Sequence, residues 1–290
     1  MKKKTVIIGA LAAVMAAGGA FVLKNDPDVL FTAVNTVKNI TANVMREPLE
    51  EADGTPVRSV AVAELAANGA ELNDCLMLVN DAHRLPEDHI PDIVNYKDTD
   101  VLFESHTAQA YAGLSAEVEE RFGEKLYVSS TYRTAEEQQE LYDEQGADTA
   151  QQPGASEHQT GLAADVYVPY FAGEGFIKSE AGRWVNENCW KYGFIVRYPA
   201  GKKSITGISY EPWHLRYVGK PNAEIIMRNG LTLEEYADFL GEGFRSCSGE
   251  SGESFLISHQ TDAIPQIPES FSSCEVSPDG CGGWYVTARK

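Results

Sequence analysis

SEHQTGLAADVYV, residues 156–168, joins a candidate metal-binding turn to a predicted strand. His158 and Asp165 stand seven positions apart, with Gly161 and other small residues between them. GLAADVYV (161–168) is rich in small, β-branched and aromatic residues and predicts a strand. The small residues allow the chain to turn from His158 back to Asp165 without crowding an ion. A third ligand and a proton acceptor must then come from elsewhere in the chain.

Helical and extended segments alternate irregularly on both sides of this stretch. KLYVSSTYR (125–133) predicts a strand, and a capping box at Thr134 predicts the start of a helix. Further strands are predicted for GFIVRY (193–198) and WHLRYVG (213–219). This irregular order favours an α+β fold over a doubly wound sheet. We expect a small, mainly antiparallel sheet with flanking helices, and a cleft at the candidate metal-binding turn.

Composition limits the classes of partner. The chain has 290 residues, 43% of them hydrophobic and 23% charged, which is typical of a globular protein with a sizeable core. Its formal net charge is −19. Nucleic-acid binding needs a basic stripe, so this charge argues against a nucleic-acid partner. We expect a monomer.

The N-terminus predicts the compartment. Lysines at positions 2–4 precede residues 5–23, which carry no charge and reach roughly 28 Å as a helix, close to a bilayer core. Residues 1–23 are therefore either an uncleaved signal anchor, which the length favours, or a signal peptide cut near positions 17–20. In both cases the remainder is extracytoplasmic, anchored to the cell membrane or secreted.

The remaining chain divides into two predicted parts. Residues 24–70 are predicted to hold a juxtamembrane helix, with apolar residues at helical spacing, and then a polar linker around 47–55. Residues 71–290 are predicted to form the main domain. Within it, 243–282 is rich in Ser, Gly, Glu and Pro and is expected to be a mobile excursion.

Five cysteines leave the disulfide pattern open. Cys274 and Cys281 flank a turn-like segment and are candidates for a pair, with Cys247 as a competitor. Cys189 lies in an apolar helical stretch, as a buried thiol would. No CxxC motif supports a zinc ribbon.

A third metal ligand is available in YEPWHLRYVG (210–219). His214 would join His158 and Asp165 as two imidazoles and one carboxylate, which leaves one position of a tetrahedral zinc open for water. A carboxylate beside such a metal can accept a proton from water and pass it to a leaving amine. Glu211 is a candidate for this role, although it lies three residues before His214 and could equally be a solvated acid.

Arg133 is the candidate for stabilising charge on the substrate. It ends the predicted strand 125–133, just before a helix, where side chains often line a cleft. A guanidinium there can hold a developing oxyanion or a substrate carboxylate. The alternative is a surface arginine that neutralises nearby glutamates.

Together these segments resemble the VanY family of zinc D-Ala-D-Ala carboxypeptidases, within a wider group of peptidoglycan peptidases. SEHQTGLAADV (156–166) resembles the SxHxxGxAxD pattern, EPWHLRYVG (211–219) resembles the ExWH segment, and STYRTAEEQ (130–138) resembles the arginine-bearing segment. The resemblance covers about residues 76–240. Residues 243–282 depart from the family pattern, and the ending CEVSPDGCGGWYVTA (274–288) resembles its closing strands only loosely.

The resemblance implies a cofactor and roles for individual residues. It implies that Zn²⁺ is held by His158, Asp165 and His214. It also implies Glu211 as general base and acid, and Arg133 as the group that holds the scissile carbonyl and the oxyanion.

Two more positions, Ser156 and Gln138, match substrate-binding positions of the family, together with Arg133. The predicted function is a hydrolase that removes the C-terminal D-alanine from peptidoglycan stem peptides of the cell wall. The alternatives are an L,D-carboxypeptidase acting on tetrapeptide stems, a D,D-dipeptidase, and a non-catalytic wall-binding module on the same fold. A purely structural zinc protein would need a fourth protein ligand, which no motif supplies.

Overall fold

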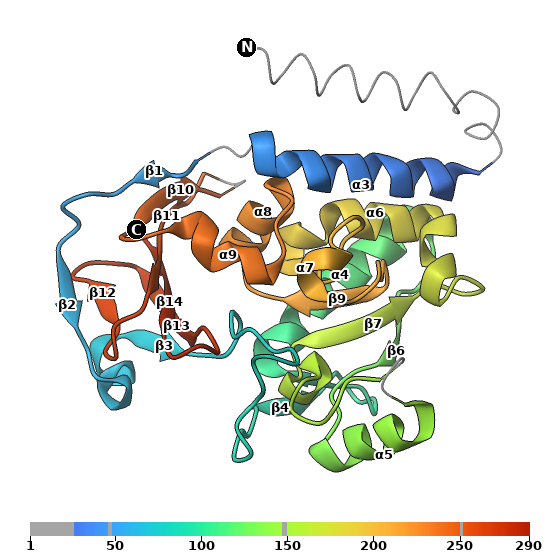
Figure 1. The fold of residues 1–290 in the computed structure, drawn as a ribbon, viewed down its shortest axis with the longest axis horizontal. Coiled ribbons are helices and arrows are strands. Elements are labelled where there is room, and N and C mark those ends of the chain that lie inside the picture. Colours follow the sequence, from blue (N-terminus) through green and yellow to red (C-terminus); the bar gives the residue numbers. More distant parts are fainter. Residues whose placement is uncertain (1–25, 46–47, 147–149, 250–251) are drawn as a thin grey trace.

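The site-bearing part of the chain is built on a four-stranded antiparallel sheet. The computed structural model describes residues 26–45, 48–146, 150–249 and 252–290 (Figure 1). The strand order is β6-β7-β9-β8, which comprises Tyr127–Ser130, Ala163–Tyr167, His214–Tyr217 and Phe194–Val196. Segments far apart in the sequence therefore become neighbours at the centre of this sheet.

Two helices cover one face of this sheet. Helices α4 (Ser105–Phe122) and α6 (Glu180–Asn188) contribute apolar side chains to a core that also includes Ala164, Val166 and Leu215 from the central strands. Because strand side chains alternate between faces, the residues between these apolar positions point to the opposite face. That opposite face carries the candidate site.

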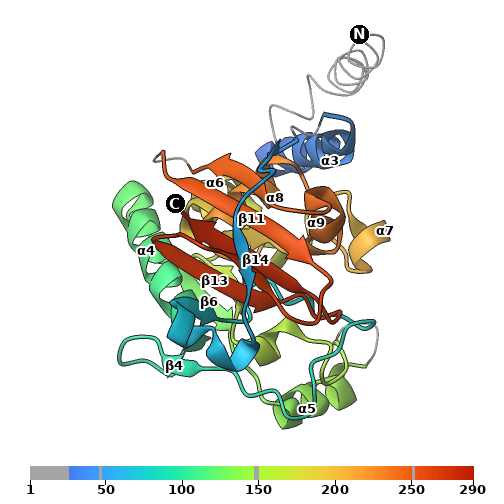
Figure 2. The same cartoon turned by 90° about the vertical axis from the view of Figure 1, so that its left-hand side faces the viewer.

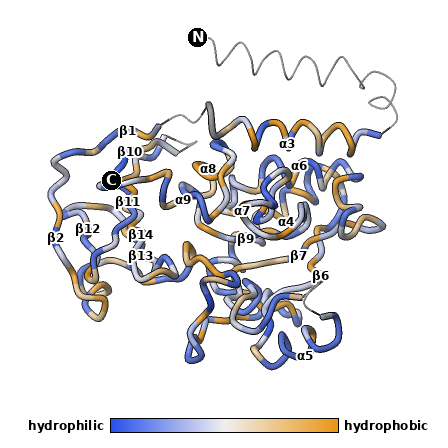
Figure 3. The backbone as a smooth tube through the Cα atoms, in the orientation of Figure 1, coloured by the Kyte–Doolittle hydropathy of each residue, from blue (hydrophilic) through white to orange (hydrophobic). Residues whose placement is uncertain are grey.

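The helix predicted from the capping box forms as expected. Helix α5 (Ala135–Gln145) begins after Thr134, whose side chain accepts a hydrogen bond from the Glu137 backbone N–H. Most of α5 is hydrophilic (Figure 3), and Gln138 is its one buried residue among those described. The helix therefore lies at the rim of the molecule, and Gln138 alone turns inward.

A second, six-stranded sheet pairs strands from residues 50–72 with strands from residues 245–289 (Figure 2). Its order is β1-β10-β11-β14-β13-β3, and every pairing is antiparallel except the parallel β13–β3 pair. A separate antiparallel pair joins β2 to β12. These strands are Glu50–Glu51, Arg245–Ser248, Ser254–Gln260, Trp284–Arg289, Ser273–Pro278, Ala70–Leu72, Val57–Ser59 and Gln266–Pro268.

This second sheet uses segments for which the sequence predicts a linker and a mobile excursion. Within residues 24–70, where only a juxtamembrane helix and a linker were predicted, Val60, Leu65 and Ala70 are buried in an apolar cluster with residues of the C-terminal strands. Residues 245–278 supply strands β10 to β13 instead of an irregular excursion. The short strands β1, β2 and β3 resemble loops in sequence because they are stabilised by partners about 200 residues away.

The remaining elements connect or cover these sheets. A short hairpin is formed by β4 (Ile93–Asn95) and β5 (Leu102–Glu104). The other helices are α7 (Lys203–Thr206), α8 (Lys220–Arg228) and α9 (Leu233–Leu240). Short 3-10 turns occur at Val62–Glu64, Ala66–Asn68, Glu157–Thr160 (η3), Gly173–Lys178 and Cys189–Tyr192 (η5). The predicted α+β class is confirmed.

Helix α3 (Pro27–Met45) lies across the body of the molecule, above α6 and α8 in Figure 1. It packs closely over two glycines: a Cβ at Gly230 would lie 2.6 Å from the Ala42 Cβ, and one at Gly201 would lie 3.0 Å from Thr36. The Asn39 side chain also donates a hydrogen bond to the Ala200 carbonyl, 3.0 Å away.

The predicted membrane segment, residues 5–23, lies outside the described residues. None of the helices in the described ranges combines the length and the apolar composition that a bilayer span needs.

Neither candidate cysteine pairing forms: all five cysteines lie within the described residues and are free thiols. Cys274 lies near the start of β13, whereas Cys281 lies beyond its other end, so more than 10 Å of strand separates them at about 3.3 Å per residue. Cys247 lies on β10, three strands away from β13 in the sheet order. Buried Cys189 agrees with its prediction.

Candidate metal centre

The central strands place Asp165 and His214 directly opposite each other. They are partners in the antiparallel β7–β9 register, and the His214 Nδ1 lies 2.9 Å from an Asp165 carboxylate oxygen. Their neighbours Val166 and Leu215 are fully buried in the core on the other face, which fixes the direction of both polar side chains. A side-chain pair 49 residues apart in sequence is thus set by strand register.

A tight turn brings His158 to the same pair. His158 lies on η3 (Glu157–Thr160), which ends at Gly161 with a left-handed φ of +72°. A Cβ on Gly161 would collide with the Ile93 side chain and lie 2.7 Å from the Glu104 backbone nitrogen, so only glycine fits here. The turn leaves the His158 Nε2 3.5 Å from Asp165 and the two imidazole rings perpendicular, with centroids 5.1 Å apart.

These three side chains form a donor set for a divalent cation. One ligand atom from each of His158, Asp165 and His214 lies within 4.8 Å of the others. The His158 Nδ1 lies 2.8 Å from the Thr131 carbonyl, which can only accept, so the ring proton is on Nδ1 and the Nε2 lone pair faces Asp165. Two imidazoles and one carboxylate match the chemistry of a zinc site with an open position.

The electrostatics of the cluster agree with cation binding. Burial lowers the pKa of His158, which favours the neutral ring that a metal requires. Burial acts to raise the pKa of Asp165, but contacts with both histidines outweigh it and lower that pKa. Burial acts to lower the pKa of His214, but Asp165 and Glu157 raise it to about 10. The two carboxylates therefore favour positive charge at this position, which a divalent cation can supply.

A turn just before β9 places Glu211 beside the cluster. The His214 backbone N–H donates to the Glu211 carbonyl across 3.2 Å, and the Glu211 N–H donates to the Tyr198 carbonyl across 3.1 Å. This turn brings a Glu211 carboxylate oxygen to 3.9 Å from the His214 Nδ1. Burial raises the pKa of Glu211, against a lowering contribution from His214. A carboxylate with a raised pKa is a stronger proton acceptor than a free one, and beside the cluster it is placed for general acid–base chemistry.

Asn186 on helix α6 restrains this turn, and no sequence pattern pointed to it. Its buried side-chain amide donates to the Pro212 carbonyl across 2.7 Å and accepts from the Tyr210 hydroxyl across 3.0 Å. Both contacts flank Glu211. Asn186 thus restrains the backbone that carries the acid.

Arg133 lies beside the cluster, in the loop between β6 and α5. Its backbone N–H donates to the His158 carbonyl across 3.2 Å, which ties it to the metal-ligand turn. Within the part of the chain that the structure describes, its buried Nε has no hydrogen-bond partner. Burial lowers the pKa of Arg133, while Asp165 acts in the opposite direction. A buried guanidinium nitrogen that the protein leaves unsatisfied is available for an oxygen of a ligand.

Ser156 and Gln138 occupy different settings. Ser156 is buried immediately before η3, adjacent to the ligand turn. The Gln138 side chain donates to the Gln151 carbonyl across 2.6 Å, and its Oε1 is buried without a partner among the described residues. Gln138 therefore holds the loop that leads into the turn, and its role in substrate binding stays a prediction.

Glu157 is a further residue that the sequence did not single out. Its fully buried carboxylate forms ion pairs of 2.7 Å with Arg197 and with Arg216. Arg197 also pairs with Glu234, with nitrogen–oxygen distances of 2.7 and 2.9 Å. Burial acts to raise the pKa of Glu157, but the two arginines and His214 outweigh it and lower that pKa. Only the fold brings these residues together, because the paired residues lie 37 to 59 positions apart.

Comparison with known proteins assigns the family. The VanY family, described as D-alanyl-D-alanine carboxypeptidase, matches residues 101–220. A D-alanyl-D-alanine carboxypeptidase of Enterococcus faecium is 35% identical over 231 residues, which cover 73% of this chain and 74% of that protein. The chain belongs to the VanY family.

Solved structures of VanY relatives share the fold. One is a variant of VanY from a VanB-type resistance cassette, in complex with Zn(II). It is 34% identical with a TM-score of 0.50, and the match covers 56% of this chain and 98% of that structure's chain. The LdcB LD-carboxypeptidase is 33% identical with a TM-score of 0.54 and covers 67% and 98%. The predicted VanY membership is confirmed.

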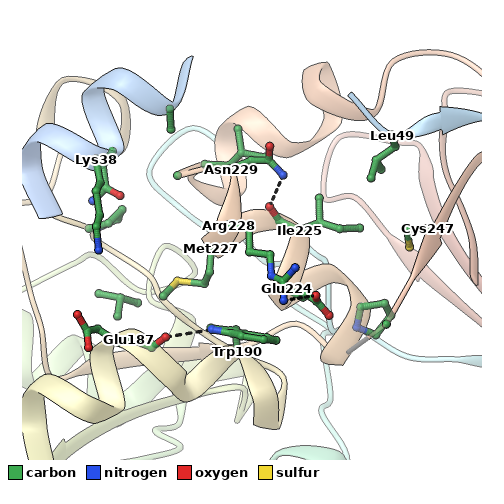
Figure 4. Close-up of a pocket in the computed structure, with 18 of the residues that line it drawn as sticks. Lys38, Leu49, Glu187, Trp190, Glu224, Ile225, Met227, Arg228, Asn229 and Cys247 are labelled. Atoms are coloured by element: carbon green, nitrogen blue, oxygen red, sulfur yellow. Dashed lines mark hydrogen bonds and ion pairs between the residues drawn. The ribbon is translucent and has the colours of Figure 1, made fainter. Parts of the chain in front are cut away.

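A separate cavity of about 1050 Å³ lies away from this VanY centre, between α3, η5, α8 and β10 (Figure 4). None of the three clustered ligand residues lines it. Arg228 pairs with Glu224 at 3.0 Å and lies over the Trp190 ring, while the Trp190 Nε1 donates to the Glu187 carbonyl. These lining groups satisfy one another, so they indicate no particular ligand.

Proposed function

We propose that this chain is a zinc-dependent D,D-carboxypeptidase that removes the C-terminal D-alanine from peptidoglycan stem peptides. The observation that carries the proposal is the convergence of His158, Asp165 and His214 within 4.8 Å, beside a buried acid and an unsatisfied arginine. The family and the fold of its relatives support the same reaction class.

His158, Asp165 and His214 hold Zn²⁺ in this proposal. When bound, zinc polarises the scissile carbonyl and lowers the pKa of water at its open position. Glu211 takes a proton from the attacking water and gives it to the nitrogen of the departing D-alanine as the C–N bond breaks. Its position 3.9 Å from His214 and its raised pKa support both steps.

Arg133 holds the scissile carbonyl oxygen as negative charge develops on it. Its unpartnered Nε and its attachment to the His158 backbone support this role, because a donor fixed beside the reaction centre needs little rearrangement in the transition state. Ser156, adjacent to the ligand turn, and Gln138 contact the substrate in the same proposal.

The substrate implies that the domain works outside the cytoplasm. We propose that residues 5–23 anchor the chain to the cell membrane, or that 1–23 are removed and the protein is secreted, and that the enzyme acts as a monomer.

A product assay tests this function. The purified protein is incubated with pentapeptide and tetrapeptide stems, with and without a chelator, and the released amino acid is identified. Release of D-alanine from the pentapeptide alone, abolished by the chelator and restored by zinc, supports the proposal. Release from the tetrapeptide alone indicates an L,D-carboxypeptidase, for which the similarity to LdcB is the supporting observation. Binding of stems without any cleavage indicates a wall-binding module.

A further inference from the structure

The two carboxylate oxygens of Glu157 have different surroundings. One oxygen, Oε1, accepts from the Arg197 Nε and from the Arg216 Nη1, both at 2.7 Å. Arg216 is itself held by the Met77 and Cys75 carbonyls, at 2.9 and 3.2 Å. Both guanidinium groups are fully buried, so Oε1 and the orientation of the carboxylate are fixed from two directions.

The second oxygen faces His214. The Glu157 Oε2 lies 3.7 Å from the His214 Nε2, which is longer than a hydrogen bond. Both atoms are buried, and neither has a hydrogen-bond partner among the described residues. Two orphaned polar atoms that face each other in a buried setting are costly unless another state of the molecule pairs them.

In the metal-bound protein, the Glu157 Oε2 and the His214 Nε2 can be paired. The His214 Nδ1 points to Asp165 and the cluster, so this nitrogen must give its lone pair to a cation. A neutral imidazole that binds a metal through Nδ1 carries its proton on Nε2. That proton points at the Glu157 Oε2, which is an acceptor already held in place.

We propose that Glu157 is a positioning residue that selects the Nδ1-binding tautomer of His214 and thereby sets the affinity of the cluster for zinc. The inference rests on the proposed function, because it takes zinc as the ion. It adds Glu157 to the site, beside the three proposed zinc ligands and the proposed catalytic acid Glu211.

The arginines explain why a carboxylate is needed. Arg197 and Arg216 can only donate, so one oxygen of residue 157 must face them. In Glu157→Gln that oxygen is the amide oxygen, and the NH₂ group then faces the His214 Nε2. An NH₂ group favours a lone pair on Nε2 and moves the proton to Nδ1, where it blocks the metal.

The experiment compares zinc affinity in two matched variants of the full-length chain, measured by chelator competition. Glu157→Gln is expected to lower the affinity 10- to 100-fold, the range typical of lost partners of metal-binding histidines. Glu234→Gln is the control, because Glu234 pairs with the same Arg197, and no contact between Glu234 and His214 appears in the described part of the structure. We expect the control to stay within about threefold of wild type, since the partner lost there does not hold a ligand ring.

The outcomes separate the inference from the proposed function. Equal affinities for Glu157→Gln and wild type overturn the role of Glu157 while leaving the zinc enzyme intact. A wild-type chain that binds no zinc overturns the proposed function, and the inference with it. If Glu157→Gln does not fold, ¹⁵N NMR of the zinc-loaded wild type decides: a protonated Nε2 on His214 supports the inference, and a protonated Nδ1 overturns it.

Discussion

Replacing Gly161 with alanine tests how tightly the fold constrains the ligand turn. The residue has a φ of +72°, and its carbonyl accepts a hydrogen bond from the Glu104 N–H across 3.0 Å. The new Cβ would collide with Ile93 and approach the Glu104 nitrogen to 2.7 Å. Left-handed strain of about 1–2 kcal/mol, overpacking of about 1–3 kcal/mol and a weakened hydrogen bond of about 1 kcal/mol together predict a loss of about 3–6 kcal/mol of unfolding free energy.

Gly123→Ala is the matched control for this prediction. Gly123 also has a left-handed φ, +67°, but a Cβ there meets no atom within 4 Å. The control should therefore lose only the strain of about 1–2 kcal/mol. Urea unfolding of both variants measures the difference, and zinc affinity should fall only in Gly161→Ala because His158 begins the same turn. Equal destabilisation of the two variants would refute the close approach of Gly161 to Glu104.

Three other perturbations address the acid, the metal and a distant ion pair. Glu211→Gln should retain zinc but lose about 10²–10⁴ in kcat, which metal analysis and turnover of a pentapeptide stem would check; normal turnover would remove Glu211 from the mechanism. His214→Ala should lose the bound zinc, and a full equivalent of zinc in the purified variant would contradict its assignment as a ligand. Hydrogen bonding to Glu104 raises the pKa of His106 to about 9, so its stabilising contribution is complete below about pH 6.5 and is lost as the pH rises through about 9. The difference in unfolding free energy between wild type and His106→Gln should therefore shrink between pH 6 and pH 10, and a constant difference would show that the pair is not charged.

The sequence was sufficient for the metal cluster because its motif is partly local. His158 and Asp165 lie within one turn and strand, and their spacing already indicates a shared site. His214 was available as a third candidate from its own segment, but the β7–β9 register that brings it to Asp165 is not visible in the sequence. The position of Glu211 could not be derived, because a strand would have placed it on the opposite face from His214, and only the observed turn brings the two together.

The supporting residues were beyond the reach of sequence for a physical reason. Glu157 and Asn186 act through partners 24 to 59 positions away. The sequence around each of them does not differ from that around an ordinary surface residue. The short edge strands of the second sheet were missed in the same way, since strands as short as Glu50–Glu51 have little periodicity, whereas its longer strands SFLIS and GGWYVTA can be predicted from their apolar and β-branched residues. The pairing of Glu50–Glu51 with β10 comes from tertiary contacts that composition does not encode.

The central claim is that His158, Asp165 and His214 together hold one zinc ion. Anomalous diffraction at the zinc edge, from crystals of the wild-type protein grown with zinc, measures this directly. The account predicts a single strong peak bounded by the His158 Nε2, the Asp165 carboxylate and the His214 Nδ1. A peak at another location, or none between these three side chains under saturating zinc, would contradict it.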